Sequence, residues 1–159
     1  MTSSAAGLYG NFGQANYGTM KLGQLGLANT LAVEGRARNI IVNTIAPTAA
    51  SRLTQDVMQL AMLQALQPEY VTPLAILLCH EAWLASGQVF EVGGGWVTQM
   101  RWQQSAGATF QPGTMSAETI AARWSEVSAF ENPHYPESIQ ASLQTLGENI
   151  GVHVALGGN

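Results

Sequence analysis

A continuous run rich in β-branched residues, Ile40–Ala46, most constrains what this chain can fold into. Pro47 ends the run, and such a run is typical of a parallel strand that is buried on both faces. A long helical pattern precedes it over residues 14–38. Helical segments follow it near Leu53–Leu66 and Pro68–Trp83. We therefore predict an α/β fold.

The predicted helix over residues 14–38 is apolar on more than one side. Its apolar side chains fall on two faces, with Leu22, Leu25, Ala28 and Ala32 on one and Met20, Leu27 and Leu31 on the other. One face would pack on the sheet, and a second copy of the chain is the simplest partner for the other. Gly23 and Gly26 would let a neighbouring backbone approach closely. We predict a homo-oligomer through this helix, with packing inside one chain as the alternative.

Two further regions complete the predicted elements. Gln88–Val92 is predicted to be a final strand, and the triple glycine after it is interpreted as a turn. Beyond Trp96 the chain becomes more polar, and Ser116 is expected to cap a helix that runs toward Phe130. The capping box is incomplete in the sequence, because Thr119 stands where Glu or Gln is usual.

Composition excludes several classes of function. Charged residues make up only 10% of the chain, against about a quarter in average soluble domains, which indicates that much of the surface is covered by a partner. The net charge is −4 and there is no basic run, so we predict no nucleic-acid binding. The longest apolar runs, Leu74–Cys79 and the strand near Ile40, are far too short to span a membrane.

The single cysteine and the histidines predict neither a disulfide nor a metal site. Cys79 lies in an apolar helical segment, where we expect a buried structural thiol. His80, His134 and His153 lack the spacing of metal ligands, so no metal is predicted. The chain opens without a secretory signal pattern, which makes a cytoplasmic location the default prediction.

Tyr17 and Lys21 are the candidate chemical residues. Within a helix their side chains lie one turn apart on the same face. An ammonium that close favours the phenolate, so the tyrosine could exchange a proton with an alcohol or a ketone. Ser4, upstream of this pair, would supply a hydroxyl to hold the substrate oxygen. The alternative is an ordinary contact on the surface of a helix.

Several runs of sequence, in order over about residues 1–146, resemble the second half of a short-chain dehydrogenase/reductase. Within that family they look like the (3R)-hydroxyacyl-CoA dehydrogenase unit of multifunctional enzyme type 2 of fatty-acid β-oxidation, or a bacterial relative. The runs are Thr2–Gly7, Gly10–Tyr17, Asn43–Pro47, Ser51–Thr54, Leu66–Val71, Leu78–Glu81 and Phe90–Trp96.

The resemblance implies a role for each candidate residue. Tyr17 would be the general acid/base, Lys21 would favour its phenolate while binding the nicotinamide ribose, and Ser4 would orient the substrate oxygen. The glycine-rich segment over residues 1–13 would be a strand end and a substrate-facing loop, with a plain connection as the alternative.

The resemblance also implies a nicotinamide cofactor, NAD or possibly NADP. The loop from Pro47 to Ala50 would line the nicotinamide carboxamide through backbone groups. The family usually has Pro-Gly there, whereas this chain has Pro47-Thr48, which weakens that assignment slightly.

The resemblance implies a domain organisation. Residues 1–99 would form a partial catalytic domain, the carboxyl-terminal part of a Rossmann-like doubly wound sheet. A helical extension would follow over residues 100–146, with a short helix at Glu137–Leu146, and a loose tail over 147–159. The family's first half, which holds the pyrophosphate and adenosine, is expected to be missing, so we expect this chain alone to bind NAD weakly or not at all.

The implied function is NAD-dependent oxidation of a (3R)-3-hydroxyacyl-CoA. Two alternatives stay open: a dehydrogenase/reductase for a steroid or other non-CoA ketone, and an inert remnant that serves only as an oligomerisation or docking surface. A peroxisomal location, as part of a longer polypeptide, is the alternative to the cytoplasm.

Overall fold

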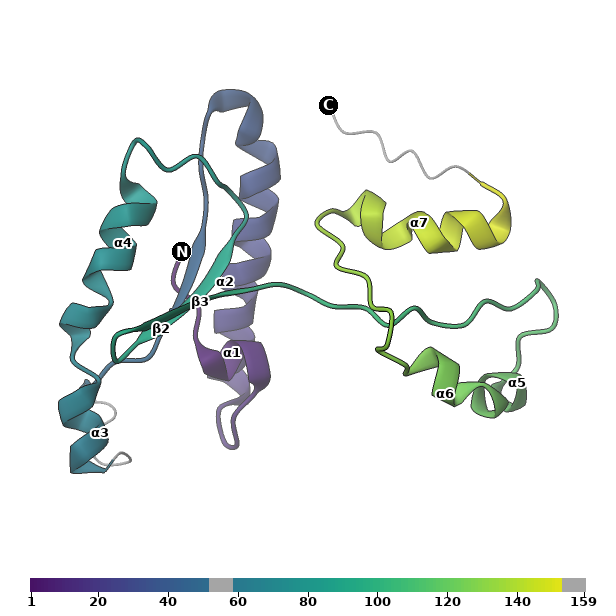
Figure 1. The fold of residues 1–159 in the computed structure, drawn as a ribbon, viewed down its shortest axis with the longest axis horizontal. Helices are drawn as coiled ribbons and strands as arrows, with labels where there is room; N and C mark the ends of the chain where they lie inside the picture. The colour runs from purple at the N-terminus through teal and green to yellow at the C-terminus, as the bar shows by residue number, and fades with distance from the viewer. Residues whose placement is uncertain (52–58, 153–159) are drawn as a thin grey trace. The chain divides into compact units, whose positions relative to one another are not determined.

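The computed structural model describes residues 1–51 and 59–152 (Figure 1). The chain divides into two compact units, Met1–Met100 and the residues from Arg101 onward. Each unit is described by itself. The start of the predicted helix Leu53–Leu66 lies outside the described residues, as does the end of the predicted tail.

A three-stranded sheet forms the centre of the first unit. Strand β1 (Thr44–Pro47) pairs in parallel with β2 (Val89–Gly93), and β2 pairs antiparallel with β3 (Trp96–Met100). Thr2 adds a single parallel bridge to Ile45 on the free edge of β1. With helices packed around it, this sheet confirms the predicted α/β class and the parallel pairing of β1. Burial on both faces is only partly realised, because Thr44 and Ala46 are buried whereas Ile45 and Pro47 are partly buried.

Strand β1 begins later than the sequence predicts, at Thr44 rather than at Ile40. The reason is that its partner β2 begins only at Val89. Before that point the Asn43 side chain, rather than backbone pairing between strands, connects the two segments. It donates to the carbonyl of Ala85 at 2.8 Å and accepts from the amide of Gln88 at 3.0 Å. The first residues of the apolar run therefore form a loop that Asn43 holds by hydrogen bonds, and only its last residues form the strand.

The prediction that Gln88–Val92 is the final strand is wrong, because β3 follows it directly. Gly93 pairs with Trp96, and the two glycines between them both have positive φ, 57° at Gly94 and 81° at Gly95. A two-residue hairpin turn of this kind requires that backbone, which glycine adopts without strain. The triple glycine is thus a turn, as predicted, but it returns the chain into the sheet.

Helix α2 (Ala15–Glu34) is shorter than predicted at its carboxyl end. Gly35 ends it, a 3₁₀ turn (η1, Arg36–Arg38) follows, and Asn39 turns the chain with a positive φ of 56°. A Cβ at Gly35 would lie 2.8 Å from both the Leu31 carbonyl oxygen and the Ile40 side chain. The reversal is therefore too tight for the helix to continue to Arg38.

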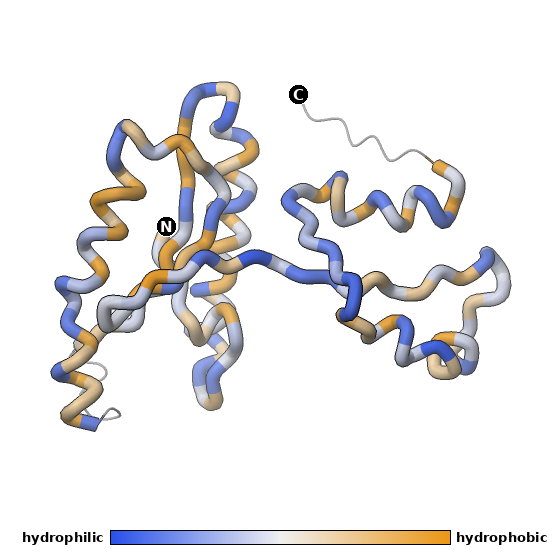
Figure 2. The backbone as a smooth tube through the Cα atoms, in the orientation of Figure 1, coloured by the Kyte–Doolittle hydropathy of each residue, from blue (hydrophilic) through white to orange (hydrophobic). Residues whose placement is uncertain are grey.

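The two apolar faces predicted for α2 differ in burial. Leu25, Ala28 and Ala32 are buried against the rest of the unit, whereas Leu22, expected on the same face, is exposed. The second face, Met20, Leu27 and Leu31, is exposed in this single chain. Figure 2 shows hydrophobic positions recurring along the length of the backbone of α2.

The main core lies on the other side of the sheet, under α4 (Thr72–Cys79). Leu74 of α4 packs with Phe90 and Val92 of β2, and the Trp83 ring meets the Phe90 ring edge-on at 6.1 Å. The short helix α3 (Leu60–Ala65) and the 3₁₀ turn η2 (Pro68–Tyr70) lead into α4. The predicted helix Pro68–Trp83 is therefore split in two and ends early.

Cys79 is exposed, which contradicts the predicted buried thiol. It lines an apolar groove of about 570 Å³ together with Pro47, Pro68, Ala75 and Ile76. The face of α4 that carries it points away from the core formed by Leu74, so an apolar helix here is covered on one side only.

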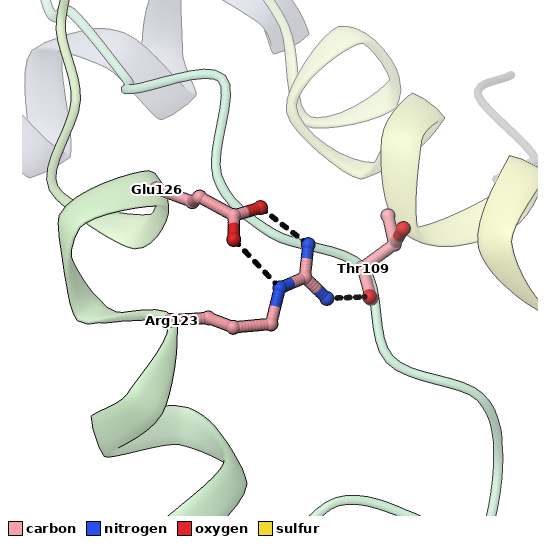
Figure 3. Close-up of polar contacts among 3 residues, drawn as sticks. All are labelled: Thr109, Arg123 and Glu126. Carbon is pink, nitrogen blue, oxygen red and sulfur yellow. Dashed lines mark hydrogen bonds and ion pairs between the residues drawn. The ribbon is translucent and has the colours of Figure 1, made fainter.

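In the second unit, the described residues up to 152 form three helices: α5 (Ala117–Ala122), α6 (Trp124–Val127) and α7 (Ile139–Ile150). The Arg123 side chain between the first two donates to the Glu126 carboxylate at 2.9 Å and to the Thr109 carbonyl at 2.7 Å (Figure 3). The same guanidinium lies 4.9 Å from the centre of the Phe110 ring. One arginine thus ties the helices to the preceding loop.

Three predictions for this unit need correction. The single helix from Ser116 toward Phe130 is broken at Arg123 into α5 and α6. The capping box is complete, because the Thr119 hydroxyl accepts from the Ser116 amide at 2.8 Å while Ser116 accepts in return. Helix α7 runs on to Ile150, so the predicted loose tail begins as helix.

Candidate functional site

Tyr17 and Lys21 lie on α2, one turn apart as predicted. The Nζ atom of Lys21 is 5.7 Å from the centre of the Tyr17 ring and donates a hydrogen bond of 3.0 Å to the Thr2 carbonyl. The Tyr17 side chain is 40% exposed, so its hydroxyl group is open to a small molecule. A cation is thus held beside an accessible phenol.

Ser4 stands at the start of a short helix, α1 (Ala5–Tyr9), in the segment predicted to be a loop. Its Oγ accepts from the Ala6 amide at 3.3 Å and so caps the helix. Accepting that bond uses an oxygen lone pair and leaves the hydroxyl proton available as a donor. No acceptor for that proton lies among the described residues. Ser4 can therefore cap α1 and still donate to a substrate oxygen.

Two glycines bring α1 against the turn of α2 that carries the candidate pair (Figure 1). A Cβ at Gly7 would lie 2.9 Å from the Lys21 Cβ, and a Cβ at Gly18 would lie 3.0 Å from the Ala6 carbonyl oxygen. The buried Ser3 hydroxyl also donates to the Lys21 carbonyl at 2.8 Å. Sequence reasoning missed these three contacts, although small residues beside a predicted site can indicate such close packing.

The predicted cofactor loop follows β1 and is held by its own hydrogen bonds. The Thr48 amide donates to the Val92 carbonyl at 2.8 Å, and the Ala50 amide donates to the Leu66 carbonyl at 2.6 Å. Pro47 has no N–H to offer. Among the described residues no hydrogen bond joins this loop to Tyr17 or Lys21. The structure therefore does not link the two predicted parts of the site directly.

A contact absent from the sequence predictions joins α1 to the sheet. The Tyr9 hydroxyl donates to the Glu91 carboxylate on β2, and the Met100 sulfur lies 3.3 Å from the same hydroxyl. This hydrogen bond is the main cause that raises the pKa of Tyr9 above its ordinary value, with burial and the charge of Glu91 adding to it. Nothing in the local sequence indicates a pairing between residues this far apart.

The described residues contain neither a cluster of metal ligands nor a membrane-spanning helix. No group of three or more His, Cys, Asp or Glu side chains in residues 1–51 and 59–152 is arranged to hold a metal ion. Within the same residues, no helix is both long enough and apolar enough to cross a membrane.

Comparison with known proteins relates the first part of this chain to a known family. Residues 1–61 match the family model described as short chain dehydrogenase. The match covers Ser4, Tyr17, Lys21 and the loop after β1.

Over most of its length the chain is similar to larger proteins named as peroxisomal multifunctional enzymes. It is 52% identical over 146 residues to peroxisomal multifunctional enzyme A of Dictyostelium discoideum, covering 92% of this chain and 33% of that protein. It is 50% identical to peroxisomal multifunctional enzyme type 2 of Mus musculus, covering 93% of this chain and 20% of that protein. The chain thus spans a third or less of the length of these relatives.

A solved structure shows the same similarity in three dimensions. Full-length peroxisomal multifunctional enzyme type 2 from Drosophila melanogaster superposes with a TM-score of 0.84 at 33% identity. The superposition covers 95% of this chain and 28% of that one. The fold is therefore that of part of a Rossmann-like short-chain dehydrogenase.

Proposed function

We propose that this protein is an oxidoreductase that uses NAD to oxidise (3R)-3-hydroxyacyl-CoA thioesters, as a part of fatty-acid β-oxidation. The observation that carries the proposal is the Lys21 ammonium beside the accessible Tyr17 phenol, within the residues matched by the family model. The names of two similar proteins, both peroxisomal multifunctional enzymes, support the substrate class.

The chain's own residues would handle the proton. Tyr17, as the general base, would accept the proton of the substrate hydroxyl. The Ser4 hydroxyl would donate to the same substrate oxygen and hold it within reach of Tyr17. The bound dinucleotide would supply the acceptor for the hydride that leaves the carbinol carbon. In the reverse direction Tyr17 would return the proton to a ketone.

The residues present fit a nicotinamide dinucleotide in part. Lys21 is a cation that can donate to ribose hydroxyls. In the loop after β1, the amides of Thr48 and Ala50 are already used. That loop can therefore meet a carboxamide mainly through carbonyl oxygens, which accept from its NH₂ group. Its place at the carboxyl end of a parallel strand is where open α/β sheets bind ligands.

The proposed function includes a cofactor and a location in the cell. We propose NAD, with NADP as the alternative, to be distinguished by comparing the two nucleotides in one assay. The relatives are named as peroxisomal, which supports the peroxisomal alternative. The cytoplasmic prediction gains no support from them.

We expect a (3R)-3-hydroxyacyl-CoA to be oxidised far faster than a steroid alcohol or a simple secondary alcohol. The reason is that binding energy from the remote CoA portion helps to orient the reacting carbon. The measurement is the initial rate of nicotinamide reduction, with NAD in large excess and the (3S) thioester as the stereochemical control. Equal rates with steroid and thioester would instead favour the non-CoA ketone enzyme.

We also propose a homo-oligomer formed through α2. Met20, Leu27 and Leu31 form a contiguous apolar face that the single chain leaves exposed, and the side chain of Leu27 is 51% exposed. An exposed apolar face of this kind, beside a buried one, favours a second copy as its partner.

We expect Leu27→Glu to shift the protein from dimer to monomer in size-exclusion chromatography, because it places a charge in the centre of the proposed interface. Val33→Glu is the matched control, since Val33 is also exposed but lies on a different side of α2. Equal elution volumes for the wild type, Leu27→Glu and Val33→Glu would contradict the proposed interface. A stable wild-type dimer that lacks oxidoreductase activity would favour the docking remnant over the enzyme.

A further inference from the structure

The Tyr9–Glu91 hydrogen bond joins the helix that begins at Ser4 to the middle strand of the sheet. Tyr9 is the last residue of α1, and Glu91 lies at the centre of β2, where it pairs with Ala46 on one side and Thr98 on the other. The Met100 sulfur on β3 lies 3.3 Å from the Tyr9 hydroxyl as well. One phenol therefore contacts two strands.

Helix α1 depends on contacts of this kind. It has 5 residues. Helices far shorter than about 12 residues are not stable by themselves in water. Its amino end is anchored by Ser3, whose amide donates to Ile45 and whose hydroxyl donates to Lys21. At its carboxyl end the chain leaves through Gly10, which has a φ of 80°, into an exposed loop. The Tyr9 side chain is what anchors that end to the sheet.

The hydrogen bond between Tyr9 and Glu91 is charge-assisted. A phenol that donates to a carboxylate makes a charge-assisted hydrogen bond, stronger than one between neutral groups. It raises the pKa of Tyr9, so the donor proton stays in place at neutral pH. The stability linked to this raised pKa is present below the ordinary pKa of tyrosine and is lost as alkaline pH removes the Tyr9 proton.

We propose that Tyr9 is a positioning residue: through Glu91 it fixes the carboxyl end of α1 and thereby the orientation in which Ser4 meets the substrate oxygen. This inference rests on the proposed function. Because α1 is a single short rod, a loose carboxyl end changes the direction of its amino end, where Ser4 lies. Tyr9 touches neither substrate nor cofactor in this account.

Hydrogen exchange tests the anchoring without any activity. The amides of Gly7 and Leu8 donate to the Ser4 carbonyl, so their exchange reports on opening of α1. We expect Tyr9→Phe to speed their exchange about threefold to tenfold, the effect of losing one charge-assisted hydrogen bond at an exposed position. Tyr70→Phe is the control, because the Tyr70 hydroxyl is exposed and makes no hydrogen bond among the described residues. Unchanged exchange in Tyr9→Phe would overturn the inference.

Kinetics then tests the positioning. We expect Tyr9→Phe and Glu91→Leu each to lower kcat about threefold to tenfold with a smaller change in KM, and the double variant to be no worse than either. Glu91→Gln keeps an acceptor and should retain most of kcat. If Tyr9→Phe speeds hydrogen exchange in α1 but keeps the wild-type kcat, the positioning role of Tyr9 is overturned and the proposed function stays intact. A wild-type protein without turnover would instead refute the proposed function, and with it the positioning role, although exchange would still measure the anchoring.

Discussion

Replacing Tyr17 with phenylalanine is expected to lower kcat by about 10²- to 10⁴-fold, the usual contribution of a general acid/base. The substitution removes one oxygen atom and leaves the ring, so α2 and the position of Lys21 beside it should persist. The measurement is the rate of nicotinamide reduction with a (3R)-3-hydroxyacyl-CoA at saturating substrate and with NAD in large excess. KM should change much less than kcat, because the lost group acts on the proton in transfer.

Tyr70→Phe serves as the control for this experiment as well, since it removes the hydroxyl of another exposed tyrosine that has no place in the proposed site. It should keep the wild-type kcat. A Tyr17→Phe protein that folds and turns over at the wild-type rate would contradict the assignment of Tyr17 as the proton acceptor.

Replacing Gly93 with alanine should lower the free energy of unfolding by about 1–3 kcal/mol, the usual cost of forcing extra volume into a packed position. A Cβ at Gly93 would lie 2.3 Å from the carbonyl oxygen of Thr48, far inside van der Waals contact with backbone. Relief requires the loop after β1 to move away from the end of β2. Urea unfolding followed by circular dichroism measures the effect, and the loop displacement should also weaken NAD binding.

Gly26→Ala is the matched control for the unfolding experiment. A Cβ at Gly26 would meet nothing within 4 Å. Alanine in a helix interior is favoured over glycine by about 0.5–1 kcal/mol, so this variant should be slightly more stable than the wild type. If Gly93→Ala were as stable as Gly26→Ala, the close packing of Thr48 on Gly93 would be excluded.

The features that the sequence predicts well are those that depend on neighbours along the chain. Tyr17 and Lys21 share a face because four residues make about one helical turn, whatever surrounds the helix. The strand ending at Pro47 is recognisable because a buried parallel strand needs a continuous apolar run. Helix ends are less predictable: Gly35 stops α2 because of contacts with Ile40, a residue beyond the helix.

The features that the sequence misses depend on partners elsewhere in the chain. Strand β3 exists because Gly94 and Gly95 turn the chain back onto β2. The aromatic and β-branched residues at Trp96–Thr98 were a local sign of it. The Tyr9–Glu91 hydrogen bond joins two residues that lie 82 positions apart in the chain. Cys79 was expected to be buried because its helix is apolar, but burial is decided by what packs on that helix.

Transfer of isotope from substrate to nicotinamide tests the central claim most directly. A (3R)-3-hydroxyacyl-CoA that carries deuterium at the carbinol carbon is incubated with the protein and NAD, and the nucleotide is analysed by mass spectrometry. If Tyr17 takes the hydroxyl proton while hydride leaves that carbon, the deuterium appears in the reduced nicotinamide, and its rate of appearance falls about 10²- to 10⁴-fold in Tyr17→Phe. Deuterium that stays on the substrate, or that is released to water, would contradict the account.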